Sequence, residues 1–205
     1  MKTKLIGALT LIFAIGAFIV IQASAQDKKP AAQKQPSQEE MMATMMKYAT
    51  PGPEHKALQP LIGSWDCSTK MWMDPSAPPT ESKGTSECKW ILGGRFIQED
   101  VTGDMGGMPF HGMGITGYDL YKKQYNWMWM DEMGTMMMYS TGNVDKTGKV
   151  FSFGGNYDDM MTGKPKTYKA NITIVDDNKH TFEMFDVGPD GKLVKNFESD
   201  YTRKQ

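Results

Sequence analysis

Residues 63–73 read GSWDCSTKMWM, and along this stretch polar and apolar side chains begin to alternate. Trp65 and Cys67 fall on one side of an extended chain, whereas Ser64 and Asp66 fall on the other. A period of two is typical of a β-strand that buries one face. The stretch therefore predicts that a β-structured domain starts here.

The same alternation recurs to the end of the chain in short segments with turn residues between them. Residues 93–94, 145–148, 176–178 and 188–191 are rich in Gly, Asn, Asp or Pro, which suit tight turns. The predicted strands are 64–73, 82–92, 95–102, 110–118, 124–131, 135–144, 150–157, 167–175, 180–186 and 193–203. This spacing leaves no room for crossover helices, so we expect an all-β, antiparallel, up-and-down sheet. A closed barrel of about ten strands is preferred over a sandwich.

Cys67 and Cys88 are the two cysteines of the chain. Their midpoint lies between Ala77 and Pro78, inside the proline-rich segment 74–79, so a symmetric hairpin would place them opposite each other. Opposite Cα atoms lie about 4.5–5.5 Å apart, which suits a disulfide. Two interpretations stay open with equal weight, a cross-strand disulfide and two buried free thiols.

A short helix is predicted before the strands. Residues 37–40, Ser-Gln-Glu-Glu, have the capping-box pattern of a helix start, and Pro51-Gly52-Pro53 ends the helix. One helix face carries four methionines, namely Met41, Met42, Met45 and Met46. Such a stripe usually packs against a neighbouring apolar surface.

Residues 1–25 have the pattern of a cleavable signal peptide. Lys2 and Lys4 precede the apolar run 5–21, and small residues end at Ala25, after which we expect cleavage. The alternative is an uncleaved membrane anchor, because the apolar run is at the short limit for spanning a bilayer. The favoured reading predicts a secreted or periplasmic protein without a stable membrane anchor.

The rest of the chain is expected to form one domain. Residues 26–36 contain no apolar side chain larger than alanine and predict a disordered linker, and residues 37–205 fit a single domain. Removing Lys2 and Lys4 from the 23 basic residues leaves 21 against 24 acidic residues, a net charge near −3. This charge excludes an electrostatic footprint for nucleic acid.

Several segments, in order, resemble a bacterial family called domain of unknown function 1579. They are 50–55 (TPGPEH), 61–66 (LIGSWD), 71–75 (MWMDP), 90–96 (WILGGRF), 112–119 (GMGITGYD), 182–185 (FEMF) and 201–204 (YTRK). The resemblance covers the chain from about Met41 to its end. It implies a lipocalin-like barrel in which Gly63-Ser64-Trp65 opens the first strand, and it implies no established activity. The chain departs from the family's pattern at Cys67 and at the methionines 136–138.

Aromatic side chains suggest a binding site inside the barrel. Trp65, Trp90, Trp127 and Trp129 are predicted to face inward and to line a pocket. The leading hypothesis is therefore a binding module for a small apolar ligand. The oligomeric state is left open.

The strand around Trp127 has two apolar faces. If Trp127 and Trp129 point inward, Met128 and Met130 point outward and need a cover. The methionine helix of the same chain is the predicted cover, and a second subunit or a ligand is the alternative.

Methionine is unusually frequent, with 19 residues in the chain. Thioethers are soft ligands that select Cu(I), so the alternative function is copper handling by Met41, Met42, Met45 and Met46. A third alternative is a structural or interaction domain with a filled core and no ligand. The three differ in what fills the barrel.

The sequence offers little for catalysis or for a cofactor. His111 could meet Glu99 or Asp100 across neighbouring strands, but such pairs arise by chance in any ten-stranded protein. No nucleophile elbow or zinc-binding histidine motif occurs. We therefore expect no enzyme activity and no cofactor.

Overall fold

The computed structural model describes residues 35–205. The predicted signal peptide, 1–25, and all but two residues of the predicted linker, 26–36, lie outside the described residues. Residues 38–205 form one compact unit that contains every strand described.

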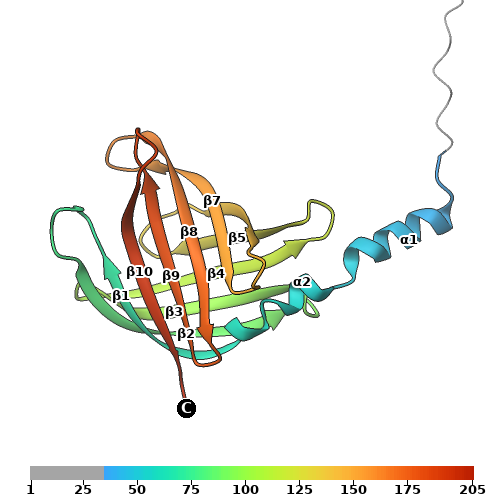
Figure 1. Ribbon diagram of the computed structural model, residues 1–205, viewed down its shortest axis with the longest axis horizontal. Coiled ribbons are helices and arrows are strands. Elements are labelled where there is room, and N and C mark those ends of the chain that lie inside the picture. Colours follow the sequence, from blue (N-terminus) through green and yellow to red (C-terminus); the bar gives the residue numbers. More distant parts are fainter. Residues whose placement is uncertain (1–34) are drawn as a thin grey trace, which may run out of the picture. The chain divides into compact units, whose positions relative to one another are not determined.

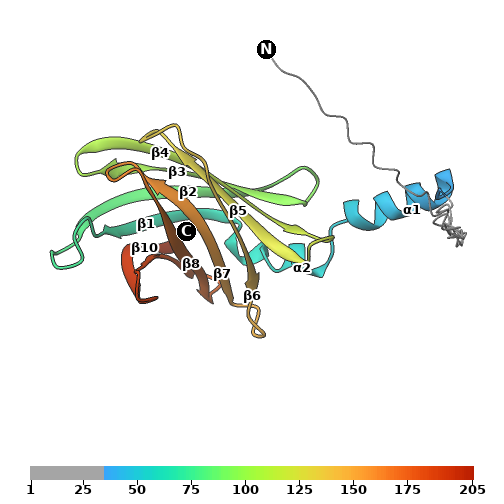
Figure 2. The same cartoon turned by 90° about the horizontal axis from the view of Figure 1, so that it is seen from above.

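Ten antiparallel strands close into a barrel, in which each strand pairs with its sequence neighbours and the first pairs with the last (Figure 1). The strands are β1 (Gly63–Met71), β2 (Thr80–Ile91), β3 (Phe96–Met105), β4 (Met108–Asp119), β5 (Gln124–Asp131), β6 (Met138–Val144), β7 (Val150–Asp159), β8 (Lys164–Asp176), β9 (Lys179–Val187) and β10 (Leu193–Arg203). Figure 2 shows the same ring of strands from above. The predicted fold class is confirmed, and all ten predicted strands overlap an observed one.

The helix α1 (Gln38–Ala49) forms where the capping pattern predicts it, but it buries no residue. The expectation that its methionine stripe packs is therefore wrong for the described residues. Two shorter helices, α2 (Pro53–Lys56) and η1 (Gln59–Leu61), follow at one end of the barrel, and Thr50-Pro51-Gly52 separates α1 from α2. None of the helices within residues 35–205 is long and apolar enough to cross a membrane.

One end of the barrel is closed by α2 and η1. Leu58 and Leu61 are buried in the main core there. The Tyr125 hydroxyl donates a hydrogen bond to the Glu54 carbonyl at 2.9 Å, and the Trp65 indole donates one to the Leu61 carbonyl at 3.0 Å. These bonds join the helical segment to the strands, so this end of the barrel is sealed.

Arg203 joins the first and last strands to this seal. Its guanidinium lies over the Trp65 ring, 4.0 Å from the centroid, in a cation–π contact. It also donates hydrogen bonds to the carbonyls of Ile62, Pro60 and Asp177. Charged donors to three carbonyls in two segments, 60–62 and the β8–β9 turn, tie the closure of the barrel to its sealed end.

The register of the first hairpin differs from the prediction for the cysteines. Cys67 lies opposite Gly84 and Cys88 lies opposite Gly63, so the two are offset by four residues, roughly 13 Å along the strand. Both thiols are free and buried. The turn centres on Pro75-Ser76, because the Asp74 carboxylate accepts the Ser76 amide at 2.9 Å. The disulfide interpretation is wrong, and the interpretation as free thiols agrees with the structure.

The outer face of β5 has a different cover from the one predicted. Met128 lies opposite Ile115 on β4 and Tyr139 on β6, and Met130 lies opposite Met113. All of these side chains point outward, and Met128 and Met130 are half-buried among their neighbours. Cross-strand contacts on the barrel surface therefore replace the expected helix.

Replacing Arg203 with leucine tests the tie between the two terminal strands. We expect Arg203→Leu to lower the free energy of unfolding by about 2–3 kcal/mol, the scale of hydrogen bonds made by a charged group. The neighbouring exposed Lys204→Ala should change it by less than about 0.5 kcal/mol. Chemical denaturation measures both, and equal small effects would show that closure does not depend on Arg203.

Candidate functional site

The barrel encloses a cavity of about 440 Å³. Leu61 and Trp65 border it near the sealed end, and Met73, Asp131 and Met133 border it at the opposite end. A volume of this size falls within the range of about 300–1,000 Å³ typical of small-molecule sites. The lumen is therefore the candidate site.

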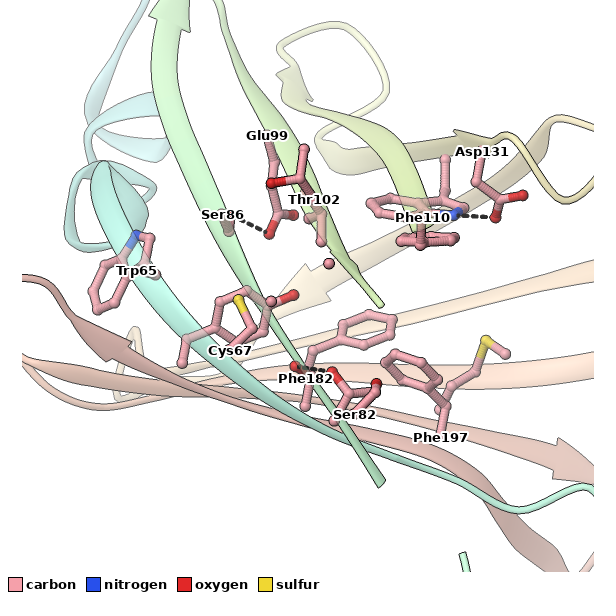
Figure 3. Close-up of a pocket in the computed structure, with 18 of the residues that line it drawn as sticks. Trp65, Cys67, Ser82, Ser86, Glu99, Thr102, Phe110, Asp131, Phe182 and Phe197 are labelled. Carbon is pink, nitrogen blue, oxygen red and sulfur yellow. Dashed lines mark hydrogen bonds between the residues drawn. The ribbon is translucent and has the colours of Figure 1, made fainter. Parts of the chain in front are cut away.

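Aromatic rings form much of the cavity wall (Figure 3). The Phe110 and Trp129 rings stack at 6.5 Å between centroids, Trp129 and Trp127 at 6.3 Å, and Trp127 and Phe182 at 5.7 Å. A Cβ atom on Gly112 would lie 2.3 Å from the Trp129 ring, so only glycine lets this indole lie against β4. The stack runs from the open end into the lumen.

Three of the four predicted pocket tryptophans border the cavity. Trp65, Trp127 and Trp129 do so, as the alternation of side chains predicts. Trp90 does not. It packs against the core at the sealed end, and its indole donates a hydrogen bond to the Gln59 side chain at 2.9 Å.

A strip of polar groups faces the aromatic wall. The Ser86 hydroxyl donates to Glu99 Oε1 at 2.9 Å, and the Tyr201 hydroxyl also hydrogen-bonds to this carboxylate. Thr69 and Ser199 hydroxyls lie 3.0 Å apart on the neighbouring strands. Figure 3 shows the Glu99 carboxylate pointing into the lumen beside Ser86. The cavity thus has one apolar and one polar side.

Burial shifts the pKa values of the acidic groups on the polar side. Burial raises the pKa of Glu99, although hydrogen bonds from Ser86 and Tyr201 oppose the shift. Burial, with the nearby Glu99 charge, raises the pKa of Cys67 to about 12 and also raises the pKa of Cys88. Both thiols therefore stay protonated and weakly nucleophilic at neutral pH.

His180 lies in a tightly packed aromatic cluster at the cavity wall. Its ring stacks on Tyr201 at 4.2 Å and meets the Trp65 edge at 4.4 Å. Burial, and then the positive charge of Arg203, lower the pKa of His180 to about 3. His180 is therefore neutral at physiological pH and serves as packing rather than as a base.

The open end carries a rim of exposed methionines from four hairpin connections. These rim methionines are Met73, Met108, Met133, Met136, Met137, Met160 and Met161. In an up-and-down barrel, the connections β1–β2, β3–β4, β5–β6 and β7–β8 share one end. Two rim methionines, Met73 and Met133, also border the cavity. Methionines that are far apart in the sequence are thus brought together around the mouth, whereas Met41, Met42, Met45 and Met46 lie on α1.

The structure does not form the acid–base pair considered from the sequence. His111 points outward near Glu132, with 4.0 Å between Nδ1 and Oε1, whereas Glu99 points inward. Asp100 is also on the outer face, 3.6 Å from the Lys89 ammonium. The inward direction of Glu99 could have been predicted from the sequence. Residues two apart on a strand share one face, so Glu99 lies on the same face as the apolar Ile97 and Val101.

The copper-binding hypothesis depends on the four methionines of α1, Met41, Met42, Met45 and Met46, and they stay exposed in the structure. Within residues 35–205, no group of three or more His, Cys, Asp or Glu side chains is placed to hold a metal ion.

The model of a family described as "Protein of unknown function (DUF1579)" matches residues 50–203. This match confirms the resemblance seen in the sequence segments. No curated protein matches the sequence of this chain.

Two solved structures have a similar barrel. Rv2717c from M. tuberculosis superposes with a TM-score of 0.56 at 16% identity, covering 76% of this chain and 100% of the other. The S-type phycobiliprotein lyase CPES from Guillardia theta superposes with a TM-score of 0.52 at 11% identity, covering 83% and 99%. At these identities the likeness concerns the fold alone.

Thiol titration tests the state of the two cysteines. We expect neither Cys67 nor Cys88 to react within minutes with Ellman's reagent at pH 8, because both are buried and their pKa values are raised. After unfolding in guanidinium without reductant, two thiols per chain should react. A count of zero would restore the disulfide, and rapid native reaction would show that the reagent reaches the lumen.

The neutral His180 predicts a loss of stability in acid. Its pKa is about 3 in the folded state against 6.5 unfolded, so between these pH values only the unfolded chain takes up the proton. The free energy of unfolding should fall with decreasing pH by up to about 1.4 kcal/mol per pH unit from this group. His180→Phe keeps the ring and should lack that slope. Parallel stability curves for both proteins between pH 6.5 and 4 would contradict this assignment.

Proposed function

Because this chain belongs to the DUF1579 family of proteins of unknown function, we propose its function from the cavity itself: the barrel binds a small apolar molecule in its lumen. The observation that carries the proposal is the enclosed space of about 440 Å³ beside a stack of four aromatic rings. Burial of apolar ligand surface against such a wall contributes about 25 cal/mol per Å².

The lumen favours a carrier over a ligand-free interaction domain. A domain of the second kind should fill its barrel with its own side chains, as small barrels commonly do. This barrel instead keeps a cavity of about 440 Å³ beside its aromatic stack. That space supports a site for a guest molecule.

The two ends of the barrel have different roles in this proposal. The sealed end, with Leu58 and Leu61 buried, retains the ligand. The rim methionines form an apolar passage at the open end, and their flexible side chains adapt to guests of different shape. A water-insoluble molecule would meet the rim methionines first and then the aromatic side of the lumen.

The proposal includes a place of action outside the cytoplasm. The signal-peptide pattern of residues 1–25 supports export, and a soluble carrier is useful where apolar molecules cross an aqueous compartment. We propose binding rather than catalysis, because the buried thiols and the neutral His180 lack the pKa values of a nucleophile or base at neutral pH.

A neutral fluorescent probe tests the site directly. N-phenyl-1-naphthylamine should bind the protein purified from its own host with a saturable rise in fluorescence. Val101 borders the cavity, so Val101→Trp should fill the lumen and weaken probe binding at least tenfold. Ile115→Trp makes the same substitution on the outer face of β4 and should change the affinity less than twofold.

Other results would redirect the proposal. Equal binding by Val101→Trp and the wild type would place the probe outside the lumen and contradict the carrier function. In native mass spectrometry, bound copper that is lost on changing Met41, Met42, Met45 and Met46 to leucine would favour copper handling instead. A released organic adduct would support the carrier.

A further inference from the structure

Glu99 is the acidic side chain on the otherwise apolar inner face of β3. It lies between Ile97 and Val101 on the inner side of β3, and its carboxylate borders the cavity. Taking a carboxylate out of water is costly unless it gains compensating partners. The hydrogen-bond partners of the Glu99 carboxylate therefore decide what it can bind.

The partners of Glu99 leave it able to accept a further hydrogen bond. Ser86 and Tyr201 both act as donors to the carboxylate. A carboxylate has about four acceptor sites, so two donors do not saturate it. Although burial raises the pKa of Glu99, its carboxyl group keeps acceptor capacity that a donor in the lumen can use.

The second oxygen of Glu99 lies beside the aromatic wall. A Cβ atom on Gly114 would be 3.6 Å from Glu99 Oε2 and 3.3 Å from Cε3 of Trp129. The carboxylate and the indole therefore both lie within contact distance of one point on β4. A ligand group that reaches Glu99 from the lumen also comes close to Trp129.

The lumen supplies no cation to neutralise Glu99. Among the described residues that border the cavity, the basic ones are Lys83, which is solvent-exposed, and His180, which is neutral at pH 7. Two other carboxylates border the cavity. Asp131 accepts the Trp129 indole at 2.8 Å and the Met133 amide at 3.0 Å, and the exposed Asp104 accepts the Gly107 amide at 2.7 Å. Glu99 is thus the acidic group within the lumen that is left for a ligand.

We propose that the ligand of this cavity is an amphipathic cation, whose protonated amine pairs with Glu99 while its apolar body lies along the aromatic stack. The inference rests on the proposed function and deepens it. An ammonium group compensates a buried carboxylate more fully than a hydroxyl does, and aromatic faces attract cations within about 6 Å. Burial raises the pKa of Glu99, and a cation beside the carboxylate would lower that pKa again.

A series of three probes with one chain length tests the proposal. Decylamine, decanol and decanoic acid, each below its micelle concentration, compete with N-phenyl-1-naphthylamine for the wild-type lumen at pH 7. The amine is then protonated and the acid ionised. We expect decylamine to compete at least tenfold better than decanol, and decanoic acid to compete least.

Two variants assign the preference to Glu99. Glu99→Gln keeps the shape and an acceptor oxygen but removes the charge, so decylamine should lose its advantage while decanol competes within threefold of its wild-type value. Asp100→Asn removes the same charge from the outer face of β3 and should keep the preference for the amine. Decanol binding by Glu99→Gln also shows that this variant is folded.

The outcomes separate this inference from the proposed function. If the three probes compete equally, or decanoic acid competes best, the cationic ligand is wrong and the apolar carrier stands. If amine preference persists in Glu99→Gln, the charge that selects it lies elsewhere and the assignment is wrong. If neither N-phenyl-1-naphthylamine nor any of the three probes binds the lumen, the carrier function itself fails. The wild-type comparison holds whether or not the variants fold.

Discussion

The structure depends on the pairing of β1 with β10, which converts a curved ten-stranded sheet into a closed barrel. Arg203 reinforces this pairing by covering Trp65 and by binding carbonyls on the segment that seals one end. An enclosed lumen requires both the β1–β10 pairing and the closed end. Without the pairing the sheet encloses no space, and without the closed end the lumen is open on both sides. The candidate site is therefore a consequence of closure, and its residues come from strands far apart in the chain.

The interior of the barrel combines two kinds of wall. Trp127 and Trp129 belong to an aromatic stack, whereas Glu99, Ser86 and Tyr201 belong to a hydrogen-bonded polar strip. A polar strip inside a barrel is costly when it serves packing alone, because a buried carboxylate loses its hydration. Because this strip borders the cavity, the two sides of the lumen differ in polarity. A bound molecule would therefore be oriented by the match between its own polar and apolar sides and these walls.

Periodicity predicted much of the fold, because local alternation carries both strand identity and the direction of side chains. It placed Trp127 and Trp129 inward and identified ten strands and a barrel. It failed where a non-local contact or a turn decides the outcome. The Asx turn at Asp74 moved the first hairpin by two residues from its assumed centre, which separated Cys67 from Cys88. The packing of α1 also could not be predicted, because cross-strand neighbours on β4 and β6 surround Met128 and Met130, which the helix was expected to cover.

Closure by the last strand also constrains how the molecule forms. Trp65 and Arg203 lie opposite each other although most of the chain separates them. Such long-range pairing must overcome a large loop-closure entropy, and barrels rich in non-local contacts fold slowly compared with helical proteins. Until β10 is synthesised and docks, β1 and β9 both present unpaired edges that can join other chains. The nascent polypeptide is thus most prone to aggregate before β10 docks, and a variant that lacks β10 would stay in that state.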